Sequence, residues 1–181
     1  QLVYLLKNLV QLVLLRKNLI MQLQNKKLVK NLDELLSLCE EYAAKNKTIV
    51  MTNGCFDILH CGHTHILEES KKLGDILIVA VNSDESIKKI KSSNRPINSE
   101  LDRSYVLSCL SSVDHIILFS EETPEEIISK VLPDILVKGS DYKGKKIAGE
   151  DILIKNNKKV ALIDLVDGKS STSIINKILN L

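Results

Sequence analysis

The feature that most constrains the fold is a regular alternation of short apolar runs and helical segments from Thr48 to the end of the chain. The apolar runs, which have the length and composition of buried strands, lie at 48–53, 75–82, 114–119, 134–138 and 159–166. Strands that alternate with helices pair in parallel, so the pattern predicts an α/β protein with a doubly wound five-stranded parallel sheet and flanking helices. Ligands of such sheets bind beyond the carboxyl ends of the strands, where the strand order reverses.

The helices of this Rossmann-like domain are marked by residues typical of helix ends. We expect Gly74 to end the helix after the first strand as a C′ residue, and Pro124 to occupy the N1 position of a later helix. The predicted helices lie at 32–45, 63–73, 83–91, 99–110, 123–132, 150–156 and 171–179.

The N-terminal residues have a different pattern, which divides the chain into a helical extension at 1–30 and the α/β domain at 31–181. Residues 2–23 form one predicted amphipathic helix with a polar stripe of Asn and Gln, and residues 24–31 are predicted to be a linker. The wide apolar face of the helix at 2–23 must be covered. We therefore expect this helix to pack on the α/β domain, on an upstream domain or on a second subunit. The extension is either an element of its own or the remnant of such an upstream domain. A membrane-surface helix is the alternative, which the shortage of Lys and Arg in the stripe disfavours.

Composition excludes several classes of protein. A net charge of +2 over 181 residues argues against a dedicated nucleic-acid-binding protein, although six of the 25 basic residues and none of the 23 acidic ones lie in residues 1–32. No uncharged apolar run approaches the ~20 residues of a membrane span. The four cysteines form no CxxC pair, which favours a cytoplasmic protein with free thiols. Because the sequence begins at Gln1 rather than Met, we expect a fragment or a processed product.

The densest group of chemically useful residues lies between the first strand and the next helix, in TNGCFDILHCGHT at 52–64. Gly54 allows a tight turn, and Gly62 allows the backbone to approach a ligand closely. Free N–H groups at the start of the following helix can bind phosphate oxygens. His60 and His63, three residues apart, can face the same anion and donate hydrogen bonds to developing charge. The segment therefore predicts a phosphate site.

Metal binding is the alternative for this segment, because His60, Cys61, His63 and His65 are all potential ligands. Spacings this tight rarely let every side chain converge on one ion, and no second cluster in the sequence supplies further ligands. We therefore expect no metal site made of protein side chains.

Five motifs in order give the chain a resemblance to a known family. The motifs are TNGCFDILHCGH, VAVNSDES, NRPIN, VKGSDY and DGKSSTSII. Over about residues 31–181 they resemble the adenylyltransferase domain of bacterial ADP-heptose synthases, which belongs to the cytidylyltransferase-like superfamily with the HxGH signature. Their order makes the resemblance more specific than HxGH alone. The last motif departs from the family, which more often has CSTTN where this chain has KSSTS.

The resemblance implies roles for individual residues. His60, His63 and Lys91 would be catalytic and would stabilise charge at the α-phosphate of the nucleotide. The implied nucleotide-binding residues are Thr52, Asn53, Gly54, Cys55, Phe56, Asp57, Gly62, Lys138, Gly139, Asp141, Ser170, Ser171 and Thr172. The implied substrate-binding residues are Asn82, Asp84, Arg95, Arg103 and Tyr142.

Local chemistry supports part of this assignment and leaves part of it open. Ser170 and Ser171 are N-cap candidates for the last helix, and a helix N-terminus is a natural anion site. Lys91 lies in a lysine-rich run, and such runs are usually solvated, so its role stays open. For Arg95 and Asp114 a structural role is favoured over a role in the site.

The resemblance also implies a reaction, in which AMP passes from ATP, accompanied by Mg²⁺, to D-glycero-β-D-manno-heptose 1-phosphate. The products would be pyrophosphate and ADP-heptose, a precursor of the lipopolysaccharide core. The alternatives are a cytidylyltransferase that acts on glycerol 3-phosphate or another small phosphorylated substrate, and a nucleotide-binding module without activity. In bifunctional members a sugar kinase domain precedes this one, whereas residues 1–30 contain no kinase motif. A homo-oligomer is also left open.

Overall fold

The computed structural model describes residues 26–91 and 94–181, and the predicted helix at 2–23 lies outside them. The strands are β1 (Ile49–Gly54), β2 (Ile76–Asn82), β3 (His115–Phe119), β4 (Ile135–Gly139) and β5 (Lys159–Ile163). The helices are α2 (Leu32–Ala44), α3 (Cys61–Lys71), α4 (Asp84–Ile90), α5 (Glu100–Ser108), α6 (Glu125–Val131), α7 (Glu150–Lys155) and α8 (Ser171–Leu179), and a 3-10 turn, η1 (Ser140–Tyr142), follows β4.

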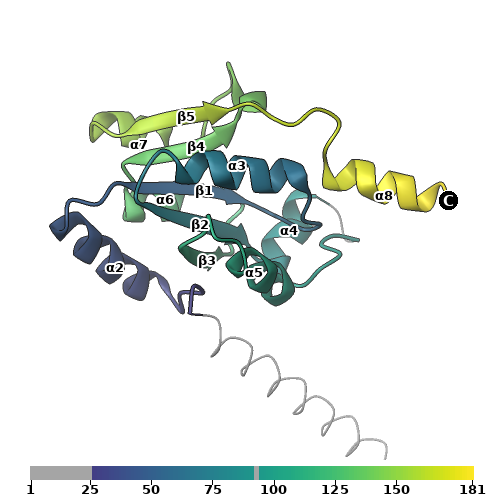
Figure 1. The fold of residues 1–181 in the computed structure, drawn as a ribbon, viewed down its shortest axis with the longest axis horizontal. Helices are drawn as coiled ribbons and strands as arrows, with labels where there is room; N and C mark the ends of the chain where they lie inside the picture. The colour runs from purple at the N-terminus through teal and green to yellow at the C-terminus, as the bar shows by residue number, and fades with distance from the viewer. Residues whose placement is uncertain (1–25, 92–93) are drawn as a thin grey trace, which may run out of the picture.

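The five strands form one sheet in the order β3-β2-β1-β4-β5, and every neighbouring pair is parallel (Figure 1). The doubly wound parallel sheet predicted from the sequence is therefore confirmed. The strand order reverses between β1 and β4, which marks the switch point at which ligands of such sheets bind. Figure 1 shows the chain continuing from β5 through a long connection to α8, which lies beyond the carboxyl ends of the strands.

Alternate side chains of the strands build two separate cores, one on each face of the sheet. In β1, Ile49 and Met51 belong to one core and Val50 to the other, as the two-residue period of a strand requires. The first core includes buried residues of α2, α6 and α7, and the second includes Leu67 of α3 and Leu107 of α5. Helices thus cover both faces, which explains why the strand sequences are apolar almost throughout.

Three aspartates secure the amino ends of the strands in the same way. Asp75, Asp114 and Asp134 each precede a strand and accept a hydrogen bond, at 2.7–2.9 Å, from a backbone N–H at the start of a neighbouring strand. Each also pairs with a lysine, at 2.5–3.0 Å. Asp114 therefore has the structural role that the sequence favoured.

Residues 27–29 are not a linker, because they pair with the edge strand β3. Leu28 forms a parallel bridge with Ile116, whose backbone N–H and C=O bond to the flanking residues at 2.7 and 2.8 Å. Val29 is buried in the first core. The linker prediction for 24–31 is wrong at this point because the short apolar segment covers an edge that would otherwise leave unpaired backbone groups.

Several helix boundaries differ from the predicted ones for local reasons. α3 begins at Cys61, earlier than predicted, because His60 is its N-cap. Pro124 lies one residue before the first turn of α6, in the N-cap position. Gly74 does not have the left-handed backbone of a C′ residue. It is needed for close packing, since a Cβ there would lie 2.6 Å from a methyl carbon of Val50. None of the helices in residues 26–91 and 94–181 is long and apolar enough to cross a membrane.

Candidate active site

A hydrogen bond between side chains links β1 and β4, the two strands that flank the switch point. Lys138, near the end of β4, donates from Nζ to Asn53 Oδ1, near the end of β1. Lys138 is buried, and this burial lowers the pKa of its ammonium to about 8, although the charge of Asp141 acts in the opposite direction. The ring of Tyr142 lies 5.3 Å from the same ammonium. These predicted site residues therefore gather at the carboxyl edge of the sheet.

The turn after β1 is tight, and a strained residue and two glycines shape it. Phe56 has a φ of 48°, in the left-handed region that costs a non-glycine residue about 1–2 kcal/mol. A Cβ on Gly54 would lie 3.1 Å from the Phe56 ring, and a Cβ on Gly62 would lie 3.0 Å from the His60 ring. Between β1 and α3 the backbone therefore packs closely against the rings of Phe56 and His60, which leaves little room for a Cβ at either glycine.

His60 and His63 stack on each other at the start of α3, with ring centroids 3.8 Å apart and planes at 23°. His60 caps the helix, because its Nδ1 accepts a hydrogen bond from the N–H of Gly62 at 3.2 Å. The neutral His60 ring thus carries its proton on Nε2, where it can be donated to a ligand. His63 packs edge-on against Phe56 at 5.1 Å, and its buried Nδ1 has no hydrogen-bond partner among the described residues.

Both imidazoles are held in the neutral form. Burial lowers the pKa of His63 to about 4, with smaller contributions from His60 and the ammonium of Lys91. Burial, followed by the charge of Lys169, lowers the pKa of His60. A neutral imidazole can donate to a phosphate oxygen without the cost of burying a cation. The histidines can therefore serve as neutral hydrogen-bond donors, and Lys91 and Lys169 supply positive charge around them.

Lys91 directly follows α4, and its charge acts on both His63 and Cys55. Its side chain is exposed and forms no ion pair with any residue that the structure describes, whereas Lys89 in the same run pairs with Glu85 at 2.8 Å. The position of Lys91 beside the histidines distinguishes it from the solvated lysines of its run.

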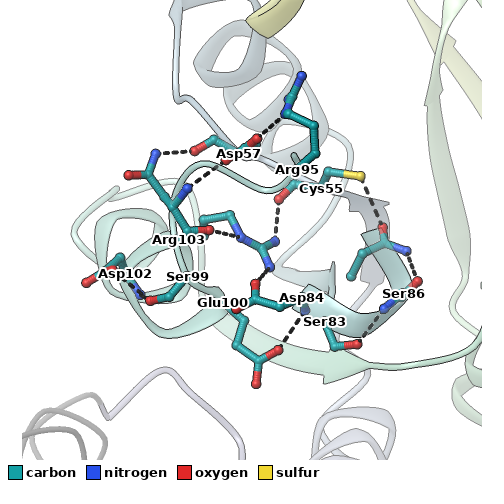
Figure 2. Close-up of polar contacts among 12 residues, drawn as sticks. Cys55, Asp57, Ser83, Asp84, Ser86, Arg95, Ser99, Glu100, Asp102 and Arg103 are labelled. Carbon is teal, nitrogen blue, oxygen red and sulfur yellow. Dashed lines mark hydrogen bonds and ion pairs between the residues drawn. The ribbon is translucent and has the colours of Figure 1, made fainter. Parts of the chain in front are cut away.

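Asp57 fixes the loop at 95–98 (Figure 2). Its carboxylate accepts hydrogen bonds from Arg95 Nε at 2.5 Å and from the backbone N–H groups of Ile97 and Asn98 at 2.8 and 2.9 Å. Burial alone would raise the pKa of this carboxyl group, but the hydrogen bonds hold it below its ordinary value. Only 1% of the Asp57 side chain is exposed, so Arg95 and Asp57 position the loop.

Arg103 is buried and joins three segments around the same turn (Figure 2). Its guanidinium donates to the Cys55 carbonyl at 2.5 Å, to the Asn98 carbonyl at 3.1 Å and to the Asp84 carboxylate at 2.7 Å. The side chain is 0% exposed. These contacts position the turn, and the direct contact between Arg103 and the substrate that the sequence predicted stays a prediction.

Other predicted site residues make contacts within the protein at the carboxyl ends of the strands. Thr52 is buried, and its hydroxyl donates to a β4 carbonyl at 3.1 Å. Asn82 is also buried, and its amide donates to Ser86 Oγ at 3.0 Å. Gly139 ends β4, where a Cβ would lie 2.5 Å from Asp141 Oδ1. These contacts position the carboxyl edge of the sheet, and direct contact with a nucleotide or a substrate stays a prediction for them.

The N-terminus of α8 meets the loop that precedes α3. Ser170 is the N-cap of α8, as predicted, and its hydroxyl accepts from the Ser173 N–H at 3.0 Å. Ser171 Oγ donates to the Ile58 carbonyl at 3.2 Å, while Thr172 is exposed. The N-termini of α3 and α8 therefore meet beside the histidine pair, and both favour negative charge.

Lys169 is a residue of this region that the sequence analysis did not identify. Its Cβ lies 3.4 Å from the position that a Cβ on Gly62 would occupy, and its charge acts on His60. Its place directly before the N-cap of α8 was visible in the sequence, but its proximity to α3 depends on the fold.

A protein cage for a metal ion is absent from residues 26–91 and 94–181, because no three His, Cys, Asp or Glu side chains gather there in a suitable way. The nearby carboxylates of Asp57 and Asp84 are already paired with arginines. A divalent cation in this region would take its oxygen ligands from bound phosphate and water.

A groove of about 660 Å³ lies away from the histidines. It runs along the edge of β3 between residues 26–34 and 117–130, and it contains none of the predicted site residues. Convergent polar groups and the lowered pKa values of His60, His63 and Lys138 mark the candidate site instead.

A doubly wound sheet whose switch point gathers two helix N-termini, exposed lysines and two neutral histidines defines a nucleotide-binding α/β protein. The model of the cytidylyltransferase-like family matches residues 51–177. The chain belongs to the cytidylyltransferase-like family, and this places it among the nucleotidyltransferases. The family resemblance drawn from the five motifs is thereby confirmed.

Curated relatives are about 50% identical to this chain over the part that aligns with it. The bifunctional protein HldE of a Nitratiruptor species is 50% identical over 149 residues, and that of Campylobacter fetus subsp. fetus is 51% identical over 148 residues. Each match covers 82% of this chain and 31% of the relative, so the chain spans less than a third of the length of these relatives.

Solved structures agree with the fold. The lipopolysaccharide core biosynthesis protein from Thermoplasma volcanium is 35% identical, with a TM-score of 0.55 over 68% of this chain and 99% of that chain. The pantoate-beta-alanine ligase from Francisella tularensis is 16% identical and has a TM-score of 0.53 over 85% of this chain and 78% of that chain. The second similarity concerns the fold alone.

Proposed function

We propose that this chain transfers AMP from ATP to D-glycero-β-D-manno-heptose 1-phosphate, with ADP-heptose and pyrophosphate as products. The observation that carries the proposal is the stacked pair of neutral histidines where the N-termini of α3 and α8 meet. The choice of sugar rests on the five-motif resemblance. It is supported by about 50% identity to the HldE proteins and by a 35% identical protein described as taking part in lipopolysaccharide core biosynthesis.

In the proposed reaction a phosphate oxygen of the sugar forms a bond to the α-phosphorus of ATP, while the bond from that phosphorus to the bridging oxygen breaks. Pyrophosphate leaves with the electron pair of the broken bond, so negative charge grows on it. His60 donates to a phosphate oxygen from Nε2, because its Nδ1 already accepts from Gly62. Lys91 adds positive charge beside His63. The attacking phosphate is already an anion, so positioning and charge stabilisation supply the rate without a strong base.

Mg²⁺ would enter with ATP and neutralise part of the charge of the phosphates. Phosphate oxygens and water would hold it, since the nearby carboxylates of Asp57 and Asp84 are paired with arginines. A cytoplasmic location follows from the resemblance and belongs to the same proposal, as does an upstream sugar kinase domain like that of the bifunctional members. The resemblance leaves a homo-oligomer open.

Pyrophosphate release in the presence of Mg²⁺ tests the proposal directly. ATP and CTP are each offered with D-glycero-β-D-manno-heptose 1-phosphate and with glycerol 3-phosphate. Release only with ATP and the heptose phosphate is the expected result. Release only with CTP and glycerol phosphate would keep the class of enzyme and overturn the substrate. Nucleotide binding without release from any pair would instead favour a module without activity.

His63→Ala tests the role of the histidine pair in that assay. We expect kcat to fall about 10²–10³-fold, as when one preorganised donor to a transition state is removed. His65→Ala, two residues further along the same helix, is the matched control and should keep the wild-type rate. Circular dichroism and thermal unfolding check that both variants are folded. A His63→Ala enzyme within a few-fold of wild type would contradict the assignment.

A further inference from the structure

Lys169 is held against the first turn of α3 by contacts between segments far apart in the sequence. It directly precedes Ser170, the N-cap of α8, and its Cβ lies 3.4 Å from the position that a Cβ on Gly62 would occupy. The hydrogen bond from Ser171 Oγ to the Ile58 carbonyl, at 3.2 Å, fixes the same junction. The start of the Lys169 side chain is therefore placed beside the histidine pair by the backbone itself.

The ammonium of Lys169 is available to a ligand. Its side chain is exposed, and no carboxylate in the part of the chain that the structure describes forms an ion pair with it. Other exposed lysines of the helices, such as Lys72, Lys89 and Lys130, are paired with glutamates at 2.6–2.8 Å. A cation without a partner beside two helix N-termini raises the local positive potential, which a polyanion would offset.

The electrostatics of the site agree with this placement. After burial, the charge of Lys169 is the next contribution to the lowered pKa of His60, just as Lys91 contributes at His63. Each histidine of the stacked pair therefore lies within the field of its own lysine. Two such cations at neighbouring positions suit a ligand with several phosphate groups better than one with a single phosphate.

We propose that Lys169 is a further phosphate-binding residue, which contacts the phosphate chain of the nucleotide and its pyrophosphate product together with the N-terminus of α8. The inference rests on the proposed function, because nucleotidyl transfer is the step that releases pyrophosphate. As the bond between the α-phosphorus and the bridging oxygen breaks, the electron pair moves to pyrophosphate, and the Lys169 ammonium offsets the added charge there.

Binding of inorganic pyrophosphate, measured by calorimetry on the full chain, tests the inference without any sugar. Lys169→Met keeps most of the aliphatic side chain near Gly62 and removes the charge, whereas Lys169→Arg restores it. Lys177→Met is the matched control, since Lys177 is exposed in the last turn of the same helix. We expect affinity for pyrophosphate to fall about tenfold in Lys169→Met, to recover in Lys169→Arg and to stay unchanged in Lys177→Met.

A titration of His60 by NMR provides a second readout, which a merely structural role of Lys169 would not move. We expect the pKa of His60 to rise in Lys169→Met and to stay below its ordinary value, because burial is the larger cause of its shift. Wild-type pyrophosphate affinity in Lys169→Met would overturn the inference, as would an equal loss in Lys177→Met. Neither result depends on the sugar phosphate, so a wrong substrate in the proposed function would leave this test intact.

Discussion

Replacing Asp57 with asparagine removes one charge from the centre of the loop network while keeping the size of the side chain. In the native protein one oxygen accepts from the backbone N–H groups of Ile97 and Asn98, and the other accepts from Arg95 Nε. The side-chain amide of Asp57→Asn keeps one acceptor oxygen in place of the two of the carboxylate. Its NH₂ group then faces either Arg95 Nε or the backbone N–H groups of Ile97 and Asn98, which are all donors. Because the Asp57 side chain is 1% exposed, water cannot easily repair the mismatch.

The expected loss follows from these contacts. A hydrogen bond to a buried charged group contributes about 1.5–3 kcal/mol, and the two remaining bonds weaken when the acceptor becomes neutral, so we expect a loss of about 2–4 kcal/mol at pH 7. For a domain of this size that loss lowers Tm by about 5–15 °C. Urea denaturation measures the free energy of unfolding, and calorimetry measures Tm. Asp102→Asn is the matched control, because Asp102 is exposed at the start of α5 and bonds to Ser99 Oγ at 2.6 Å.

The pH dependence of this loss has a defined sign. The pKa of Asp57 is lowered in the folded state, so its contribution is present above the ordinary aspartate pKa and is lost as pH falls through the folded value. The gap in stability between wild type and Asp57→Asn should therefore narrow below the ordinary value of 3.8. A variant within about 0.5 kcal/mol of wild type at pH 7 would refute the reasoning, since surface changes typically have effects of that size.

One substitution and two truncations test the fold. Gly74→Ala should lower the free energy of unfolding by about 1–3 kcal/mol, as overpacking does, because its Cβ would meet a methyl carbon of Val50 at 2.6 Å; urea denaturation measures the loss, and an unchanged midpoint would contradict the close packing. Deleting residues 1–25 should leave a folded and active domain. Deleting residues 1–30 should cost a further ~2 kcal/mol, because it removes the buried Val29 and its pairing with β3. Equal Tm and equal activity of the two truncated forms would show that this pairing contributes nothing.

Much of the fold was readable from the sequence because it depends on neighbours along the chain. The alternation of apolar runs with helical segments follows from the two periodicities of strands and helices, and it predicted the parallel sheet. The N-cap at Ser170 was readable because capping needs only a side-chain oxygen and the next few backbone N–H groups. The placement of His60 and His63 at a helix start was predicted for the same reason.

Local sequence patterns gave incomplete or wrong predictions where the conformation or the contacts of a residue depend on a segment far away in the sequence. Gly74 was predicted to supply a left-handed turn, whereas the structure uses it for the close approach of another strand. Residues 27–29 have the polar flanks of a linker, yet they pair with an edge strand far along the chain. Arg103 matched a motif, but the sequence could not show that its guanidinium donates to Cys55, Asn98 and Asp84, which depends on the packing of its loop.

The sequence by itself therefore determined that strands alternate with helices, that they pair in parallel, and that a turn with two glycines and two histidines, the predicted phosphate site, follows the first of them. The tertiary structure alone decided that β1 lies beside β4, that Lys138 reaches Asn53, and that Lys169 lies against the start of α3. The physical reason is that periodicity and capping are set within a few residues. The adjacency of strands is instead set by the packing of both cores over the whole chain.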